Sequence, residues 1–255
     1  MKTCIAVICH KPVKFKDLNE QIYIPVEVGA SYRDNHFFEN LDNSGDNISN
    51  KNESYCELTG LYWLYKNHNF DIIGLVHYRR FFMKSNFCLR KKLINILGED
   101  KIKSILANYD IILPKKRHYY IETNYSHYVH AHKKEALDIM INIVKEREPD
   151  YYMSLQKHLK SRSGHYFNMF IASSNVAVPL LDWIFSILNE VEKNINIDEY
   201  LGAERRVFGY LSELLFDVYC YKNKLRIRNQ KYLFFEKQNR VKKGLNFLLR
   251  KIKIR

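Results

Sequence analysis

The adjacent arginines Arg79 and Arg80 are the residues of this 255-residue sequence whose position most directly indicates chemistry. Only His77 and Tyr78 separate them from Ile72–Val76, a short apolar run typical of a buried parallel strand. Ligands of open α/β sheets bind at the carboxyl ends of such strands, and guanidinium groups match phosphate oxygens in pairs. The arginines therefore predict a phosphate-binding site. The alternative is two surface charges paired with nearby acids.

A second polar candidate, Asn168, lies inside the apolar run Tyr166–Ala172. A buried amide must satisfy its hydrogen bonds. Asn168 therefore either bonds the neighbouring backbone or points into a pocket and binds sugar hydroxyls, and the motif alone does not decide between the two.

Three histidines, His127, His130 and His132, suggest a metal site, because His-x-His can chelate an ion from a strand. No acidic or thiolate ligand completes the set at a recognisable spacing, so we favour histidines packed among the neighbouring tyrosines. No DxD motif follows any candidate strand either, and this motif is the usual clamp for a divalent ion and a nucleotide diphosphate. We predict no metal and no other cofactor, but Asp46 or a histidine holding Mg²⁺ or Mn²⁺ stays open.

Three further signatures are absent from the sequence: GxSxG, GxxxxGK[ST] and GxGxxG. Their absence disfavours a serine hydrolase of that type, a P-loop kinase and a dinucleotide-binding enzyme.

The elements that must position these residues read as alternating strands and helices. Short apolar runs predict buried strands, and each gap between them has room for a helix, which indicates an α/β sheet built from βαβ units. These runs are Thr3–Cys9, Ile72–Val76, Tyr109–Leu113 and Tyr166–Ala172. Ser54 and Glu57 predict a capping box that opens a helix to Asn67. Apolar periodicity predicts further helices over Lys133–Arg147, Asn175–Glu192 and Tyr200–Phe216.

Residues 32–52 lack periodicity and are rich in Asn, Asp, Ser and Gly, a composition that forms turns. A loop of this length inside a compact domain is usually functional or disordered. Because it directly precedes a predicted helix, we expect an ordered loop at the site.

The net charge of +13 is concentrated at the C-terminal end. Residues 218–255 hold 13 basic residues and 1 acidic one, whereas residues 1–217 are nearly neutral. We predict a domain over 1–230 and a basic tail over 231–255, in which 239–255 form an amphipathic helix suited to an anionic membrane surface. A nucleic-acid enzyme more often spreads its charge along a groove, so we predict no nucleic-acid partner.

The sequence also indicates a compartment. No apolar run approaches the roughly 20 residues of a membrane helix, and the first apolar stretch is too short for a signal peptide. The five cysteines are odd in number and form no CxxC pair, which argues against disulfides and a zinc ribbon. We expect a cytoplasmic protein.

Five sequence motifs stand out: GDNISNKNESYCELTGLYW (45–63), IGLVHYRRFF (73–82), YDIILP (109–114), NMF (168–170) and RVFGYLSE (206–213). They resemble one family, the bacterial capsular polysaccharide and exopolysaccharide glycosyltransferases, long carried as a domain of unknown function. Together they span roughly residues 2–220. In the last motif the family pattern leads us to expect an arginine where this sequence has Leu214.

The resemblance implies a GT-A-like, Rossmann-type α/β fold with flanking helices. It implies a glycosyltransferase that moves a galactose-type sugar from a UDP-sugar donor to a lipid-linked glycan acceptor, working peripherally at the inner face of the plasma membrane. The rival hypothesis is a non-catalytic, membrane-associated member of a polysaccharide assembly complex.

Site residues follow from these two lines of reasoning. Arg79 and Arg80 would bind the donor diphosphate and stabilise its departing charge. Nucleotide-sugar binding would also involve the loop residues and the buried amide, namely Asp46, Asn47, Ser49, Asn52 and Asn168. An inverting enzyme needs a catalytic base at the acceptor hydroxyl. The candidates are His77, Glu57 and Glu213, among which the sequence does not choose.

Overall fold

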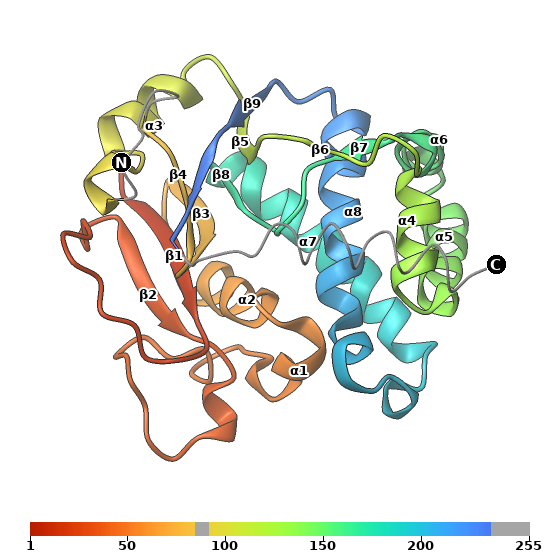
Figure 1. The fold of residues 1–255 in the computed structure, drawn as a ribbon, viewed down its shortest axis with the longest axis horizontal. Coiled ribbons are helices and arrows are strands. Elements are labelled where there is room, and N and C mark those ends of the chain that lie inside the picture. The colour runs from red at the N-terminus through yellow and green to blue at the C-terminus, as the bar shows by residue number, and fades with distance from the viewer. Residues whose placement is uncertain (85–91, 236–255) are drawn as a thin grey trace.

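The computed structural model describes residues 1–84 and 92–235. Within these residues a mixed sheet of eight strands forms the centre of the molecule (Figure 1). Its main order is β2-β1-β3-β8-β5-β9, and the short strands β4 and β10 extend it beyond the end of β3. The strands are β1 (Thr3–Cys9), β2 (Tyr23–Glu27), β3 (Ile72–His77), β4 (Arg80–Phe82), β5 (Ile111–Pro114), β8 (Phe170–Ser173), β9 (Ile227–Gln230) and β10 (Tyr232–Phe234).

The apolar runs form buried strands because both faces of the sheet are covered. Every residue of β1 is buried, and its side chains alternate between two cores. Ala6 packs with the helices on one face, whereas Val7 packs with Ile102 and Ile105 on the other. The predicted α/β class is confirmed.

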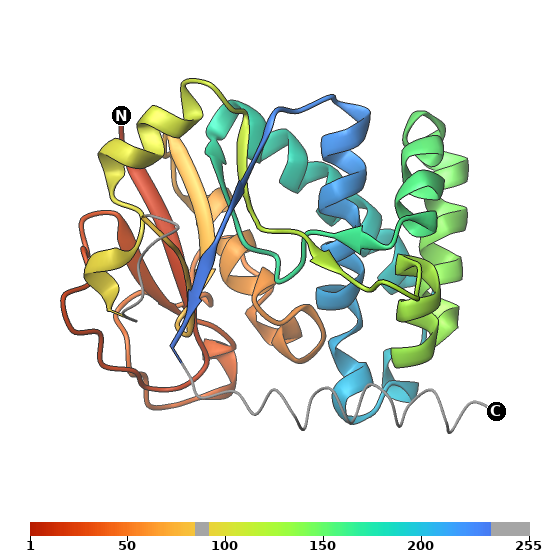
Figure 2. The same cartoon turned by 45° about the horizontal axis from the view of Figure 1, so that its top comes forward.

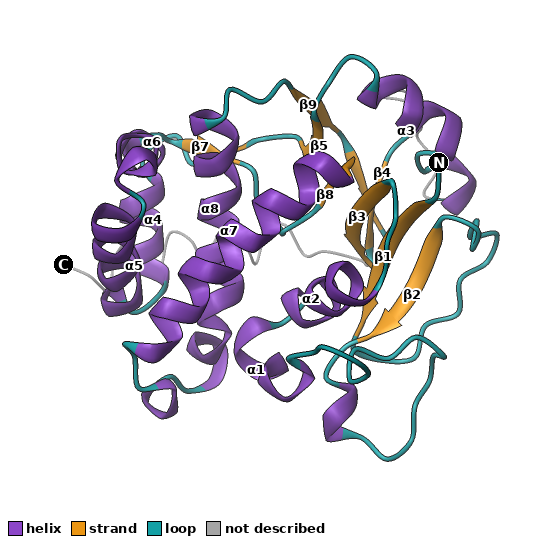
Figure 3. Ribbon diagram, turned by 180° about the vertical axis from the view of Figure 1, so that it is seen from behind, coloured by secondary structure: helices purple, strands orange, loops and turns teal. Residues whose placement is uncertain are grey.

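Helices form two groups. The first covers the sheet: α2 (Leu58–Asn67) and α7 (Ser174–Lys193) pack on one face and α3 (Glu99–Leu106) on the other (Figure 3). The second stands beyond the β8–β9 side of the sheet and packs largely on itself and on α7 (Figures 1 and 2). Its members are α4 (Asn124–Ala131), α5 (Lys134–Arg147), α6 (Pro149–Lys160) and α8 (Val207–Lys222). The two groups meet near the carboxyl end of β3, where the candidate site lies.

The strand predicted over 166–172 differs from expectation in both start and direction. It begins at Phe170 and runs antiparallel to its neighbours β3 and β5, with Phe170 opposite Leu75. A continuous apolar run reports burial but carries no information on direction, which explains the error. Since β8 is antiparallel, its first residues lie at the edge where β3 ends.

The capping-box prediction is wrong. The short helix α1 (Asn52–Tyr55) ends at Cys56, whose φ of 53° breaks the chain direction before α2 begins at Leu58. The Ser54 hydroxyl donates to the carbonyl of Lys51, and the Glu57 carboxylate accepts a bond from Asn168 instead of capping a helix. The sequence has the capping-box pattern, but the Glu57 carboxylate accepts its hydrogen bond from a distant residue, Asn168, and not from the helix N-terminus.

The other predicted helices are confirmed, with shifted ends. The helix predicted over Tyr200–Phe216 begins at Val207 and continues to Lys222. The residues before it, Gly202–Arg206, form a 3₁₀ helix whose first residue, Gly202, has a φ of 56°. The sheet extends to Phe234, past the boundary predicted at residue 230. The amphipathic tail over 239–255 lies outside the described residues. In the part of the chain that the structure describes, no helix is long and apolar enough to cross a bilayer.

Candidate active site

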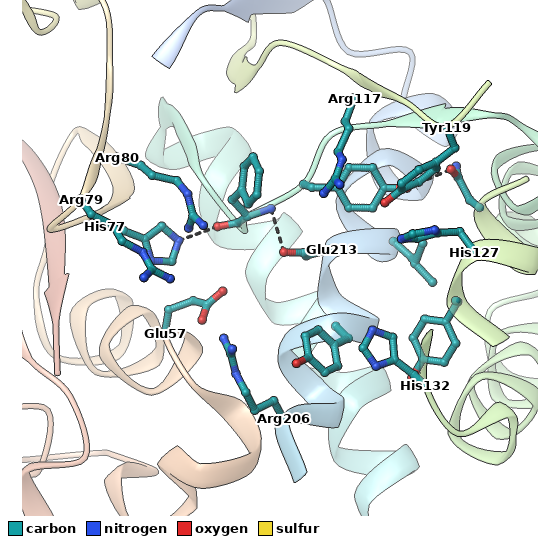
Figure 4. A pocket seen from close by; sticks show the side chains of 16 residues that line it. Glu57, His77, Arg79, Arg80, Arg117, Tyr119, His127, His132, Arg206 and Glu213 are labelled. Carbon is teal, nitrogen blue, oxygen red and sulfur yellow. Dashed lines mark hydrogen bonds between the residues drawn. The ribbon is translucent and has the colours of Figure 1, made fainter. Parts of the chain in front are cut away.

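A cavity of about 250 Å³ opens where β3 ends and β8 begins (Figure 4). Side chains from both helix groups and from the strand ends line it. They are Glu57, His77, Arg79, Arg80, Arg117, Tyr119, Asn124, His127, Tyr128, His132, Tyr166, Phe167, Arg206, Tyr210, Glu213 and Leu214. The position agrees with the expectation that ligands bind at the carboxyl ends of parallel strands.

Four arginines give the cavity its positive charge. The structure brings the predicted pair Arg79 and Arg80 together with Arg117 and Arg206, which sequence reasoning did not assign. The Arg80 guanidinium lies 4.3 Å from the ring centroid of Phe167, and burial together with the neighbouring Arg79 lowers the pKa of Arg80. Crowded guanidinium groups beside a cavity are typical of an anion site.

Phe167 has a strained backbone that organises part of the site. Its φ of 80° lies in the left-handed region, which a bulky residue rarely adopts. Its N–H donates to Glu213 Oε1 at 2.8 Å, and its carbonyl accepts from His77 Nε2 at 2.8 Å. Strain of this kind costs about 1–3 kcal/mol per residue and clusters at functional sites.

Asn168 continues the left-handed segment, with a φ of 52°. Its side-chain amide donates to Glu57 Oε1 at 2.8 Å and to the Gly209 carbonyl at 3.0 Å, and its oxygen accepts from the Ser212 hydroxyl. The side chain is buried, and these bonds use its donors and its acceptor within the protein. Asn168 therefore satisfies its hydrogen bonds inside the protein, though mainly through distant side chains and not through the neighbouring backbone: it positions Glu57, and the amide is not placed to bind a sugar hydroxyl.

The three base candidates differ in chemistry. Burial lowers the pKa of His77, and because a carbonyl can only accept, Nε2 carries the proton and Nδ1 is the basic nitrogen. Burial and the neighbouring Glu57 raise the pKa of Glu213 to about 7. A carboxylate with a pKa near the working pH suits general base catalysis. The Glu213 carboxylate accepts a bond from the Phe167 N–H, whereas Arg206 Nε donates to Cys56 Sγ.

With this geometry in hand, comparison with known proteins identifies the family. Residues 4–224 match the family described as Domain of unknown function (DUF4422). The chain belongs to this family. Its fold is similar to the solved apo structure of the bifunctional glycosyltransferase WbbM, with a TM-score of 0.84 and 30% sequence identity over 93% of this chain. The chain spans 46% of that protein's length. No curated protein matches it.

The expected GT-A-like fold is thereby confirmed for this DUF4422 chain: a sheet with parallel strands, flanked by helices, that matches the fold of a glycosyltransferase. The family resemblance drawn from the motifs is confirmed at the level of a glycosyltransferase family.

The predicted site loop of this chain is ordered around a buried acid, Asp42. The Asp42 carboxylate accepts bonds from the Ser49 hydroxyl, the Thr59 hydroxyl and two backbone N–H groups. Asn47 turns back on the loop itself, where its Oδ1 accepts from the Ser49 N–H. Ser49 thus stabilises the loop, and neither residue lines the cavity.

Two other loop residues have different surroundings. Asp46 accepts from the Tyr62 hydroxyl at 3.1 Å, away from the cavity. Asn52 lines an adjoining cavity of about 260 Å³, which shares Glu57, His77, Arg79 and Arg206 with the first. Asn52 is therefore the loop residue that the structure places beside the arginines.

The histidines lie on and after α4, not on a strand, so the proposed chelating geometry is wrong. The Nδ1 atoms of His127 and His130 contact the two oxygens of Glu122 at 2.9 and 2.8 Å, and His132 Nδ1 lies 3.3 Å from Glu204 Oε1. Burial favours the neutral Glu122, but bonds from the two histidines outweigh it and lower the pKa of that carboxyl. Among the described residues, no group of three or more His, Cys, Asp or Glu side chains could hold a metal ion.

Proposed function

We propose that this chain is a nucleotide-sugar-dependent hexosyltransferase. It would transfer a galactose-type sugar, in pyranose or furanose form, from a UDP-sugar to a lipid-linked glycan during synthesis of a capsule, exopolysaccharide or O-antigen. The observation that carries the proposal is a cavity that joins four arginines to two carboxylates, in a fold shared with a glycosyltransferase at 30% identity. The uridine nucleotide, the sugar and the acceptor rest on the family resemblance of the sequence.

The donor diphosphate would bind to Arg79, Arg80 and Arg206. These guanidinium groups would stabilise the charge that grows on the leaving diphosphate, a role that a divalent ion often fills. The described cavity residues do not fit such an ion. The cavity has two carboxylates, Glu57 and Glu213, and among the described residues no third His, Cys, Asp or Glu joins them in a group that could hold an ion. The proposed mechanism therefore includes no step through a metal.

Glu213 is the proposed base for an inverting transfer. Its carboxylate would take the proton of the acceptor hydroxyl as the acceptor oxygen forms a bond to the anomeric carbon. The bond from that carbon to the diphosphate oxygen breaks, and its electron pair leaves with the diphosphate. Glu57 accepts a hydrogen bond from Asn168. In Figure 4 it lies on the donor side of Glu213, between the Arg79/Arg80 pair and Arg206. Its negative charge there helps to keep the pKa of Glu213 high.

A lipid-linked acceptor confines the reaction to a membrane surface. We place the enzyme in the cytoplasm, peripheral at the inner face of the plasma membrane, with residues 239–255 on anionic lipid. The support for this step is the charge and apolar pattern of the tail sequence.

The experiment that tests the proposal is a donor screen. Purified protein is incubated with UDP-galactopyranose, UDP-galactofuranose, UDP-glucose and GDP-mannose, and release of the nucleoside diphosphate is measured. We expect release from a UDP-sugar, and much less in a Glu213→Gln variant that is folded by circular dichroism. Folded wild-type protein that hydrolyses none of the donors and binds no nucleotide would favour the non-catalytic alternative.

A further inference from the structure

The end of the cavity away from the arginine pair has no role in donor binding so far. Tyr119, His127, Tyr128, His132 and Tyr210 line it. In Figure 4, His127 and His132 lie on the opposite side of Glu213 from Arg79 and Arg80. We call these five residues the aromatic end of the cavity.

Two of its histidines are fixed in orientation. The His127 ring stacks on Tyr119 with centroids 3.7 Å apart, and the His132 ring stacks on Tyr210 at 3.9 Å, each with an interplanar angle of 22°. The Nδ1 atom of each ring faces a carboxylate, that of Glu122 or Glu204. Because a carboxylate accepts, Nδ1 carries a proton in both rings. The negative charges of Glu122 and Glu204 offset the positive charge that either ring carries when it is doubly protonated.

The Tyr128 hydroxyl provides an independent observation. Tyr128 is 5% exposed and lines the cavity, yet its hydroxyl is buried with no hydrogen-bond partner among the described residues. A buried hydroxyl without a partner costs free energy, and such groups call for an explanation. A ligand that brings its own hydroxyl into the cavity supplies one.

We propose that the aromatic end is the binding site for the acceptor saccharide, with Tyr128, His127 and His132 bonding its hydroxyls. This inference rests on the proposed function, because an acceptor presupposes sugar transfer. Sugars offer hydroxyls around an apolar C–H face, which suits aromatic rings with polar edges. Arg117 and Arg206 lie over the Tyr119 and Tyr210 rings, 5.4 and 5.5 Å from the ring centroids, so the two ends of the cavity adjoin, and a diphosphate is better served at the end that holds Arg79 and Arg80. An acceptor at the aromatic end has Glu213 between it and the donor, where a base must lie.

Direct saccharide binding tests this assignment without requiring turnover. The probes are methyl β-galactopyranoside and methyl β-galactofuranoside, and binding is measured by saturation-transfer NMR. We expect saturable binding of at least one probe to the wild type. Tyr128→Phe and His127→Gln should each weaken it about tenfold, which is typical of one lost hydrogen bond in a site. Calorimetry should find UDP affinity within about twofold of the wild type in both variants.

His130→Gln is the matched control. His130 shares the Glu122 carboxylate with His127 but does not line the cavity, so we expect saccharide binding to be unchanged. Wild-type binding by both Tyr128→Phe and His127→Gln would overturn the assignment. So would equal losses in those variants and in His130→Gln. Saccharide binding with this pattern, in a protein that hydrolyses no donor, would support the site and contradict the proposed function alone.

Discussion

Replacing Glu213 with Gln should remove activity and change the pH dependence of stability. The pKa of this carboxyl is raised from 4.5 to about 7, so ionising it costs about 3 kcal/mol more in the folded protein than in the unfolded chain. Between pH 4.5 and 7 the unfolded chain has lost this proton and the folded protein keeps it. The free energy of unfolding therefore falls as pH rises through this window, and Gln abolishes the effect.

The measurement is urea unfolding of both proteins at pH 5 and pH 8. We expect the stability of the variant relative to the wild type to rise by about 2.5 kcal/mol between the two, because part of the effect is already present at pH 5. The bond from the Phe167 N–H is retained, since the Gln side-chain oxygen also accepts. Donor turnover should fall by about 10²–10⁴-fold in the variant, and wild-type turnover should decline below about pH 7 as the base is protonated.

Glu146→Gln is the control, because Glu146 is an exposed carboxylate on α5, far in the chain from any cavity residue. It should show neither effect. A wild-type-to-variant difference that is the same at pH 5 and pH 8 would refute the buried-acid argument. Near-wild-type turnover by Glu213→Gln would refute its role as the base.

Three further predictions concern the arginines, metal and the tail. Arg79→Ala or Arg80→Ala should cut turnover by about 10²-fold or more, with Lys restoring only part of it because the planar fork is lost; two folded Ala variants with near-wild-type transfer would make the pair structural. EDTA should leave much of the activity intact, whereas complete loss that Mg²⁺ or Mn²⁺ reverses would contradict the charge assignment. A chain ending at Gln238 should still use soluble acceptor mimics but no longer sediment with anionic liposomes, and the full chain should bind them less at high salt. Equal sedimentation of both chains would remove the tail as an anchor.

The sequence predicted those parts of the site that depend on local pattern. Arg79 and Arg80 follow an apolar run in sequence, and the end of a buried strand is where ligands bind, so their position could be derived. The same logic failed for the direction of β8, because an apolar run reads alike in both directions. It failed again at Cys56, where a positive φ interrupts what the pattern presented as one helix.

The rest of the site depends on contacts between distant segments. Arg117 and Arg206 come from a short strand and a 3₁₀ turn, and only tertiary packing brings them to Arg80. The link from Asn168 to Glu57 joins residues 111 positions apart. The pKa of Glu213 reflects burial and a neighbouring charge, neither of which is encoded near residue 213 in the sequence. The RVFGYLSE motif did contain both Arg206 and Glu213, but sequence reasoning gave Arg206 no role and left Glu213 as one of three base candidates.

The central claim, that the arginines at the end of β3 bind a donor diphosphate, is tested most directly by locating a bound nucleotide. The measurement is a crystal structure of the protein with UDP, or with the nucleotide of the best donor in the screen. The account predicts that the diphosphate oxygens lie within hydrogen-bonding distance of the Arg79, Arg80 or Arg206 guanidinium groups, with Glu213 beyond the terminal phosphate. A nucleotide bound elsewhere, with the arginine end empty of phosphate, would contradict it.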